Sequence, residues 1–279
     1  MAIIGFWSAS EKETGQTLAA TALATYMGIK HNYKILLVDG TFNDDVMERC
    51  FWKITPKNDP TRMLNKGKVD ISSGAEGLVS AVASNKITPE IIPNFTRVVL
   101  KNRLDVLCGL KTVIPEEFRK SLMLYKDLVT IADKYYDLVI VDIEKTLKSD
   151  TTKALLGASH LIVPNFTQNY KQFEEYVTAV SANRKIFDKS KLIPVLTNAD
   201  DNSKYNVKNV SRVLKEKDLN TVQYNPVFKD SASEAAVANF FLRYGLSTTG
   251  NDKNAGFIKA LDNIDKTIDY KLEELKYKV

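Results

Sequence analysis

The sequence has few of the residues that most often build disulfide frameworks, metal centres and acid–base pairs. Its 279 residues include two cysteines, Cys50 and Cys108, and two histidines, His31 and His160. Two cysteines cannot form a disulfide framework, and nothing near them has the spacing of metal ligands. The two histidines stand alone in the sequence. We therefore expect no structural metal site, no histidine-based catalysis, and a reducing compartment, the cytoplasm.

Other classes of protein are also excluded by what is scarce. With 12 glycines and 8 prolines the chain is neither collagen-like nor of low complexity, and 44% hydrophobic residues exclude disorder. No apolar run approaches the roughly 20 residues that a membrane-spanning helix needs. Residues 1–7 lack a basic leader and a cleavage site, which argues against secretion. The net charge of +5 permits contact with nucleic acid or anionic lipid but does not require it.

Short apolar runs alternate with longer helical patterns along most of the chain. The predicted strands are Ala2–Trp7, Lys34–Asp39, Leu104–Cys108, Leu138–Asp142, His160–Pro164, Leu192–Thr197 and Thr221–Tyr224. The predicted helices are Thr17–Lys30, Pro115–Lys134, Gln168–Phe187, Val207–Lys217 and Ser231–Tyr244. The hydrophobicity of these strands is mostly continuous rather than alternating, as expected of strands covered on both faces. The pattern predicts an α/β fold, a doubly wound and mostly parallel sheet flanked by helices, in one domain over residues 1–279.

The first strand, loop and helix occupy the place of a phosphate-binding loop. Such a loop uses glycines, whose backbone N–H groups turn toward phosphate, and a lysine that reaches the β- and γ-phosphates. Here Gly15 is the only glycine of the turn, Gln16 stands at the lysine position, and Thr17 is at the position that holds Mg²⁺. Asp39 and Asp142 each end an apolar strand, where a phosphate-bound metal would lie.

These residues resemble the ParA/MinD superfamily of deviant P-loop ATPases, from the first strand to about Val237. The family loop K-G-G-x-G-K-T-T corresponds to E-K-E-T-G-Q-T-L at residues 11–18. The family's two strands that end in aspartate are similar to those ending at Asp39 and Asp142, and its A-D-x-V-I-V-P strand resembles residues 158–164. Asn198 resembles the asparagine that reads adenine, and Pro226 lies in a segment similar to the family's late I-P-Y motif.

The resemblance implies a nucleotide site and a fold that works as a homodimer. The implied nucleotide-binding residues are Lys12, Gly15, Gln16, Thr17, Leu18, Asn198 and Pro226, and the implied Mg²⁺ ligands are Thr17, Asp39 and Asp142. The family's signature lysine, which reaches the partner's phosphates, falls on Glu11. Two carboxylates, Glu11 and Glu13, would also lie beside a triphosphate. We therefore expect ATP and Mg²⁺ to bind weakly or not at all, and no catalytic residue is assigned.

Within the superfamily the chain is most similar to the atypical TadZ/CpaE branch, which places pilus or secretion machinery. Residues 77–82 and 103–109 carry this resemblance. It implies a dimeric scaffold or localisation factor with protein partners in a larger assembly. Two alternatives stay open: an active ATPase that switches between monomer and dimer, using Lys12 as a phosphate contact, and a partition protein that binds DNA nonspecifically.

Three further features have a structural and a functional interpretation. Basic residues surround the predicted helix 207–217, and together they could bind DNA. The favoured interpretation is a solvated amphipathic helix whose core-facing residues are Val207, Val210, Val213 and Leu214. A C-terminal helix at about residues 255–276 has a balanced polar face, so we expect it to dock on protein, with membrane contact at most peripheral. We expect Phe51, Trp52 and His160 to belong to the core.

Overall fold

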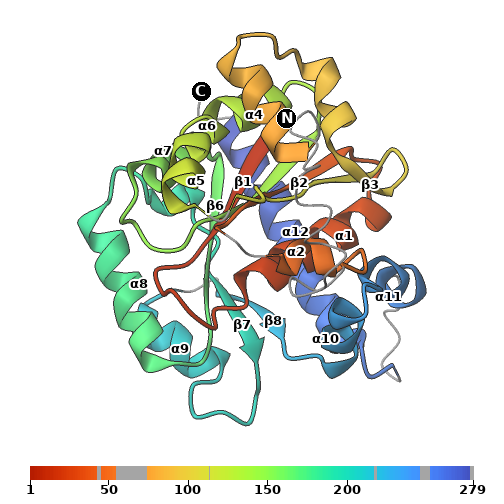
Figure 1. The fold of residues 1–279 in the computed structure, drawn as a ribbon. Helices are drawn as coiled ribbons and strands as arrows, with labels where there is room; N and C mark the ends of the chain where they lie inside the picture. The colour runs from red at the N-terminus through yellow and green to blue at the C-terminus, as the bar shows by residue number, and fades with distance from the viewer. Residues whose placement is uncertain (43–44, 55–73, 113, 217–218, 246–251, 277–279) are drawn as a thin grey trace.

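The protein is built around one eight-stranded sheet (Figure 1). The computed structural model describes all residues except 43–44, 55–73, 113, 217–218, 246–251 and 277–279. The strands are β1 (Ala2–Trp7), β2 (Ile35–Gly40), β3 (Arg97–Leu100), β4 (Leu104–Leu107), β5 (Leu138–Ile143), β6 (Leu161–Phe166), β7 (Val195–Ala199) and β8 (Asn220–Gln223). Their order is β3-β4-β2-β5-β1-β6-β7-β8, with only β3 and β4 antiparallel. The predicted fold class is confirmed.

The central strands form because apolar residues occupy both of their faces. Every residue of β1, β2, β5 and β6 is buried. Neighbouring residues along a strand point to opposite faces, so Ile4 and Ile3 of β1 belong to two different core clusters. The sequence did not predict β3, because this edge strand is half exposed and starts with an arginine. The strand predicted from Leu192 begins at Val195 instead, where the ladder with β6 becomes continuous.

One face of the sheet is covered by helices from both ends of the chain (Figure 1). They are α1 (Gln16–Lys30), α2 (Val46–Arg49), α10 (Pro226–Ser233), α11 (Val237–Tyr244) and α12 (Ala255–Lys276). An aromatic group joins the last three, with the rings of Phe228 and Phe257 stacked 4.9 Å apart. The predicted helix Ser231–Tyr244 is two helices, because Ala235 takes a left-handed conformation with φ of +60° between α10 and α11.

The other face is covered by helices from the middle of the chain. They are α4 (Gly74–Ala83), the 3₁₀ helix η2 (Pro89–Phe95), α5 (Pro115–Leu122), α6 (Tyr125–Ala132) and α7 (Asp150–Ala158). A third cluster lies at the β7 end, under α8 (Tyr170–Ala182) and α9 (Val207–Leu214). The 3₁₀ turn η3 (Lys189–Lys191) precedes β7 in the chain, and Lys271 of α12 donates to two of its carbonyls. The predicted helix Pro115–Lys134 is interrupted between α5 and α6, and the sequence did not predict α4 or α7.

The apolar stripe of α12 is used inside the chain. Ile264 and Ile268 are almost fully buried, Leu272 and Leu275 pack against the same core, and the helix contacts α1 and β8. Among the described residues no helix combines the length and the apolarity that crossing a membrane requires.

The core positions predicted for α9 and for the Phe51–Trp52 pair differ in how well the structure bears them out. On α9, Val210 and Leu214 are buried, but Val213 is 47% exposed, so its predicted core position is wrong. Val213 is next to Arg212 in the helix, and both lie on its exposed side. Phe51 and Trp52 are half-buried against the core, and the Arg97 guanidinium lies 3.7 Å from the Trp52 ring centre. Lys217 lies outside the described residues.

Candidate functional site

The loop between β1 and α1, residues 8–15, is fixed by the elements around it. Gly15 is the N-cap residue of α1 and has a φ of +66°, which glycine adopts without a steric penalty. A Cβ at this position would lie 3.0 Å from the Thr197 Cβ, so the loop passes close to β7. The Thr197 hydroxyl donates to the Thr14 carbonyl at 2.5 Å, and Gln172 Nε2 on α8 donates to the Lys12 carbonyl at 3.3 Å. The backbone of the loop is therefore held on two sides.

Gln16, at the lysine position, points into the sheet. Its side chain is buried, and Nε2 lies 2.6 Å from Asp142 Oδ1, 2.7 Å from the Ile143 carbonyl oxygen and 3.2 Å from the Phe6 carbonyl oxygen. The Gln16 amide thus bonds the carboxyl ends of β1 and β5 beneath the loop. An amide in this place supplies hydrogen-bond donors but no positive charge.

The two strand-end carboxylates lie side by side and are buried. Asp39 and Asp142 are directly opposite in the β2–β5 register and are 2% and 0% exposed. Asp39 Oδ1 accepts from the Thr41 N–H at 3.0 Å and from its hydroxyl at 2.7 Å, which fixes the turn after β2. Thr17 is buried at the start of α1, with 8% of its surface exposed. The sheet register therefore brings together the two predicted carboxylate ligands, at the end where α1 begins.

The outer surface of the loop is charged on both sides. Glu11 forms an ion pair with Lys148, and this hydrogen bond lowers the pKa of the Glu11 carboxyl below its ordinary value. Glu13 and Lys12 are exposed, and Glu13 has a left-handed φ of +53°. The Ser10 hydroxyl donates to Glu175 on α8. The residue at the family's signature-lysine position is therefore an acid that is paired with a cation of its own chain.

A pocket of about 580 Å³ opens between the start of α1, β7 and the β8–α10 segment. Gly15, Leu18 and Asn198 lie in its wall, and Asn198 is exposed with a φ of +50°. Polar side chains at its edge include Gln168, Asn169, Gln223 and Asn225, and its apolar floor includes Val222, Phe228 and Phe257. Glu13 and Lys229 are its charged residues. The pocket therefore offers amides and aromatic surface, with one acid on the loop side.

A second hollow of about 860 Å³ lies on the other side of the loop, against α8. Lys12 and Lys148 line it together with Glu174 and Glu175. The segment after β5 closes this side, because the Thr146 N–H donates to the Ser8 carbonyl at 2.8 Å and Trp7 Nε1 donates to the Thr146 carbonyl at 2.9 Å.

The residues predicted from the sequence do not all reach one place. Gly15, Leu18 and Asn198 share the first pocket, Pro226 begins α10 beside it, and Lys12 lines the second hollow. Gln16 is turned away into the sheet next to Asp142. The sequence analysis did not identify Thr197, Gln172 or Lys148 as contacts of the loop. These residues lie 130 or more positions away along the chain, and no local motif marks them.

One prediction about the histidines is wrong. His160 is exposed and precedes β6, although its Nδ1 accepts from the Ile3 N–H at 2.9 Å. His31 is isolated in the sequence, but the fold places it beside Asp265 and Asp269. Its neighbours come from α12, more than 230 residues later, so spacing in the sequence could not indicate them.

Solved structures share this fold. No family model and no curated protein matches the sequence. A ParA family ATPase from Chlorobium tepidum has a TM-score of 0.69 at 15% identity, with 94% of this chain and 97% of the other covered. The septum site-determining protein MinD of Pyrococcus horikoshii, complexed with Mg-ADP, has a TM-score of 0.66 at 16% identity, with 97% and 98% covered. MinD in the MinC:MinD cell division complex of Aquifex aeolicus has a TM-score of 0.64 at 10% identity, with 96% of each chain covered. The fold is thus that of ParA and MinD ATPases.

Proposed function

We propose that this chain is a degenerate ParA/MinD-like protein that acts as a dimeric scaffold or localisation factor and hydrolyses ATP weakly or not at all. The observation that carries the proposal is the Gln16 side chain. At the position where the family has its phosphate-binding lysine, this chain has a neutral amide whose nitrogen bonds to Asp142 and the Ile143 carbonyl.

The residues around the loop do not fit a triphosphate. Phosphoryl transfer depends on positioning and on cations that offset the charge of the transition-state oxygens. The loop holds exposed acids at positions 11 and 13, and Glu11 already neutralises Lys148. Two like charges about 4 Å apart repel by about 4 kcal/mol at an effective dielectric constant of 20. Loss of one electrostatic contact costs about 100- to 1,000-fold in rate. We derive no catalytic step for this site.

The structural role follows from what the same residues do in this fold. The Gln16 amide, the Thr197 hydroxyl and the Gln172 amide connect the loop to β5, β7 and α8. A loop ordered in this way keeps the surrounding surface in one shape, which suits a scaffold better than a nucleotide-driven switch. The neighbour in the MinC:MinD complex supports protein partners in general. The resemblance to TadZ/CpaE proteins suggests pilus or secretion machinery as the larger assembly.

Titration calorimetry with Mg-ATP, together with phosphate release, tests the proposal. We expect no micromolar binding and turnover near background. The variant that combines Gln16→Lys with Glu11→Lys restores both family cations, and gain of binding or turnover would identify the missing charges as the cause. Glu11→Gln is the matched control, because it removes the acid without adding a cation. Micromolar binding and family-like hydrolysis by the wild type would overturn the proposal.

The active ATPase is the second candidate, and exposed Lys12 favours it as an improvised phosphate contact. In that case Gly15, Thr17, Leu18, Asn198 and Pro226 surround the nucleotide, with Thr17, Asp39 and Asp142 around Mg²⁺. Light scattering with and without Mg-ATP separates the two, because the scaffold is a dimer in both conditions and the switch only with nucleotide.

Nonspecific DNA binding is the third candidate, supported by basic side chains around α9. Lys204, Lys208, Arg212 and Lys215 are exposed on or next to α9, and Arg184, Lys185 and Lys189 are exposed between α8 and β7. Binding through phosphates weakens steeply as salt rises. A mobility shift that is absent even at low salt would remove this candidate.

A further inference from the structure

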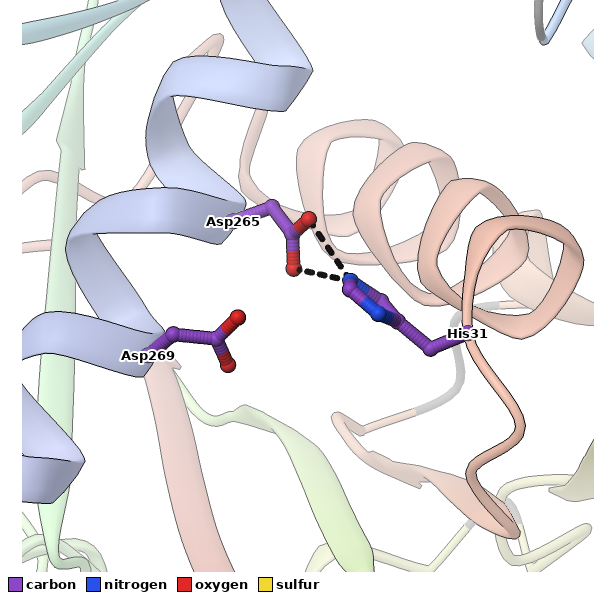
Figure 2. Close-up of side chains that lie close together, drawn as sticks. All are labelled: His31, Asp265 and Asp269. Atoms are coloured by element: carbon purple, nitrogen blue, oxygen red, sulfur yellow. Dashed lines mark hydrogen bonds and ion pairs between the residues drawn. The ribbon is translucent and has the colours of Figure 1, made fainter.

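The end of α1 meets α12 at a cluster of one imidazole and two carboxylates (Figure 2). His31 is the C-cap residue of α1, and Asp265 and Asp269 are one turn apart on α12. One ligand atom from each of the three residues lies within 4.8 Å of the others. Figure 2 shows the imidazole turned toward the two aspartates from the opposite helix. Nothing in the loop 8–15 contributes to this cluster.

The imidazole and the buried carboxylate are already oriented. His31 stacks on Tyr33, with ring centres 4.7 Å apart and an interplanar angle of 19°. Its Nε2 lies 2.8 Å from Asp265 Oδ2 and 3.0 Å from Oδ1. Lys30 Nζ donates to Oδ2 of the same carboxylate at 2.7 Å. A carboxylate whose one oxygen is held by an outer donor is typical of a metal ligand that binds through its other oxygen.

The charge of the cluster is not balanced around Asp269. Lys30 and Lys266 pair with Asp262, and Lys30 also pairs with Asp265. For Asp269, no lysine, arginine or histidine nitrogen of the described residues lies within 4.0 Å of the carboxylate. A divalent cation between the two carboxylates would remove their mutual repulsion.

We propose that His31, Asp265 and Asp269 form a site for a divalent transition metal, with Zn²⁺ as the best match. An imidazole with two carboxylates suits Zn²⁺ or Co²⁺ better than Mg²⁺ or Ca²⁺, which prefer oxygen ligands only. Zinc holds nitrogen and oxygen ligands at about 2.0–2.2 Å in a tetrahedron, so neighbouring ligand atoms are about 3.3–3.5 Å apart. The 3.0 Å contact between His31 Nε2 and Asp265 Oδ1 must therefore open slightly, and the Asp269 carboxylate must move inward. Water would take the fourth position.

A metal here would join the two helices that cover the first core cluster. Because α1 begins at the loop 8–15 and α12 closes the described chain, the metal would fasten the last helix to the first. Binding to the folded state alone would raise the stability of the fold in proportion to the logarithm of the metal concentration. The inference does not depend on whether the loop binds nucleotide.

Competition with a chromophoric zinc indicator tests the site on the full chain. We expect one Zn²⁺ per chain at micromolar concentration, a rise in Tm with Zn²⁺ and none with Mg²⁺. Asp269→Asn and His31→Gln should each weaken Zn²⁺ binding by about tenfold or more, the scale at which even outer ligand partners act. Asp262→Asn is the matched control, because it removes one negative charge from the same helix seam without removing a ligand. It should change the affinity by less than either of the two ligand variants.

Two results of the Zn²⁺ binding assay would overturn the proposal. One is the absence of Zn²⁺ binding at micromolar concentration. The other is equal weakening by Asp269→Asn and Asp262→Asn, which would mean that only the general negative charge attracts the ion. Asp269 is half-buried, so its variant should fold even if the His31 variant does not. Co²⁺ bound to the wild type should give an absorption spectrum without thiolate charge transfer; such a band would assign the ion to a cysteine instead.

Discussion

Replacement of Gln16 by methionine measures how much the inward-pointing amide stabilises the fold. The side chains have similar length, so Gln16→Met removes the donors and leaves little cavity. Three acceptors lie within 3.2 Å of Nε2, but an amide nitrogen carries two hydrogens, so two bonds form at once. The shortest contacts are to Asp142 and to the Ile143 carbonyl, at 2.6 and 2.7 Å.

The magnitude follows from the type of each acceptor. A hydrogen bond to a charged group contributes about 1.5–3 kcal/mol and one to a neutral group about 0.5–1.5 kcal/mol. Gln16 and Asp142 are 1% and 0% exposed, so water does not replace the lost donors. We therefore expect the free energy of unfolding of Gln16→Met to fall by about 2–4.5 kcal/mol.

Urea denaturation, followed by circular dichroism, gives this difference from the shift of the midpoint at unchanged slope. Gln168→Met is the matched control: its Nε2 donates to two neutral carbonyls at 2.7 and 3.0 Å, its Oε1 accepts from the Asp200 N–H at 3.1 Å, and the side chain is partly exposed. We expect the control to lose clearly less stability. A loss below about 0.5 kcal/mol for Gln16→Met, or equal losses in both variants, would refute the assigned role of the amide.

Three further perturbations have definite expected outcomes. In Gly40→Ala the new Cβ would lie 2.9 Å from the Asp142 carbonyl oxygen, which is a backbone atom and cannot move aside as a flexible side chain can. The free energy of unfolding should therefore fall by about 1–3 kcal/mol. Urea denaturation measures this, and an unchanged midpoint would contradict it. Burial raises the pKa of Asp105, which accepts from the Tyr136 hydroxyl at 2.8 Å, so the folded state holds the proton more readily than the unfolded state. The free energy of unfolding of the wild type, relative to that of Asp105→Asn, should therefore decrease as the pH rises from about 4 to 7. A difference that does not change with pH would contradict this expectation. Burial raises the pKa of the Cys108 thiol to about 12, so little reactive thiolate is present at pH 8. Mass spectrometry should therefore show slow alkylation of the native chain at pH 8 and fast alkylation in urea. Equal rates would show that the thiol is accessible in the native chain.

The sequence by itself determined the sheet and the departure of its first loop from a phosphate-binding one. Continuous apolar runs predicted the central strands β1, β2, β5 and β6, because strands buried on both faces are apolar at most positions. The absence of a lysine at position 16 and of glycines at positions 12 and 13 is also visible in the sequence. Both are local properties, which a short window of residues contains in full.

The tertiary structure decided what the replacement residues do. Gln16 reaches Asp142 across 126 positions, Glu11 pairs with Lys148, and His31 meets Asp265 from the far end of the chain. Each contact is between a polar side chain and a partner that only the order of strands or the packing of α12 on α1 brings near. No sequence window contains both members, and polar residues at such distances have no periodicity to reveal them. The chemistry of this protein therefore depends on pairs that only the folded chain creates.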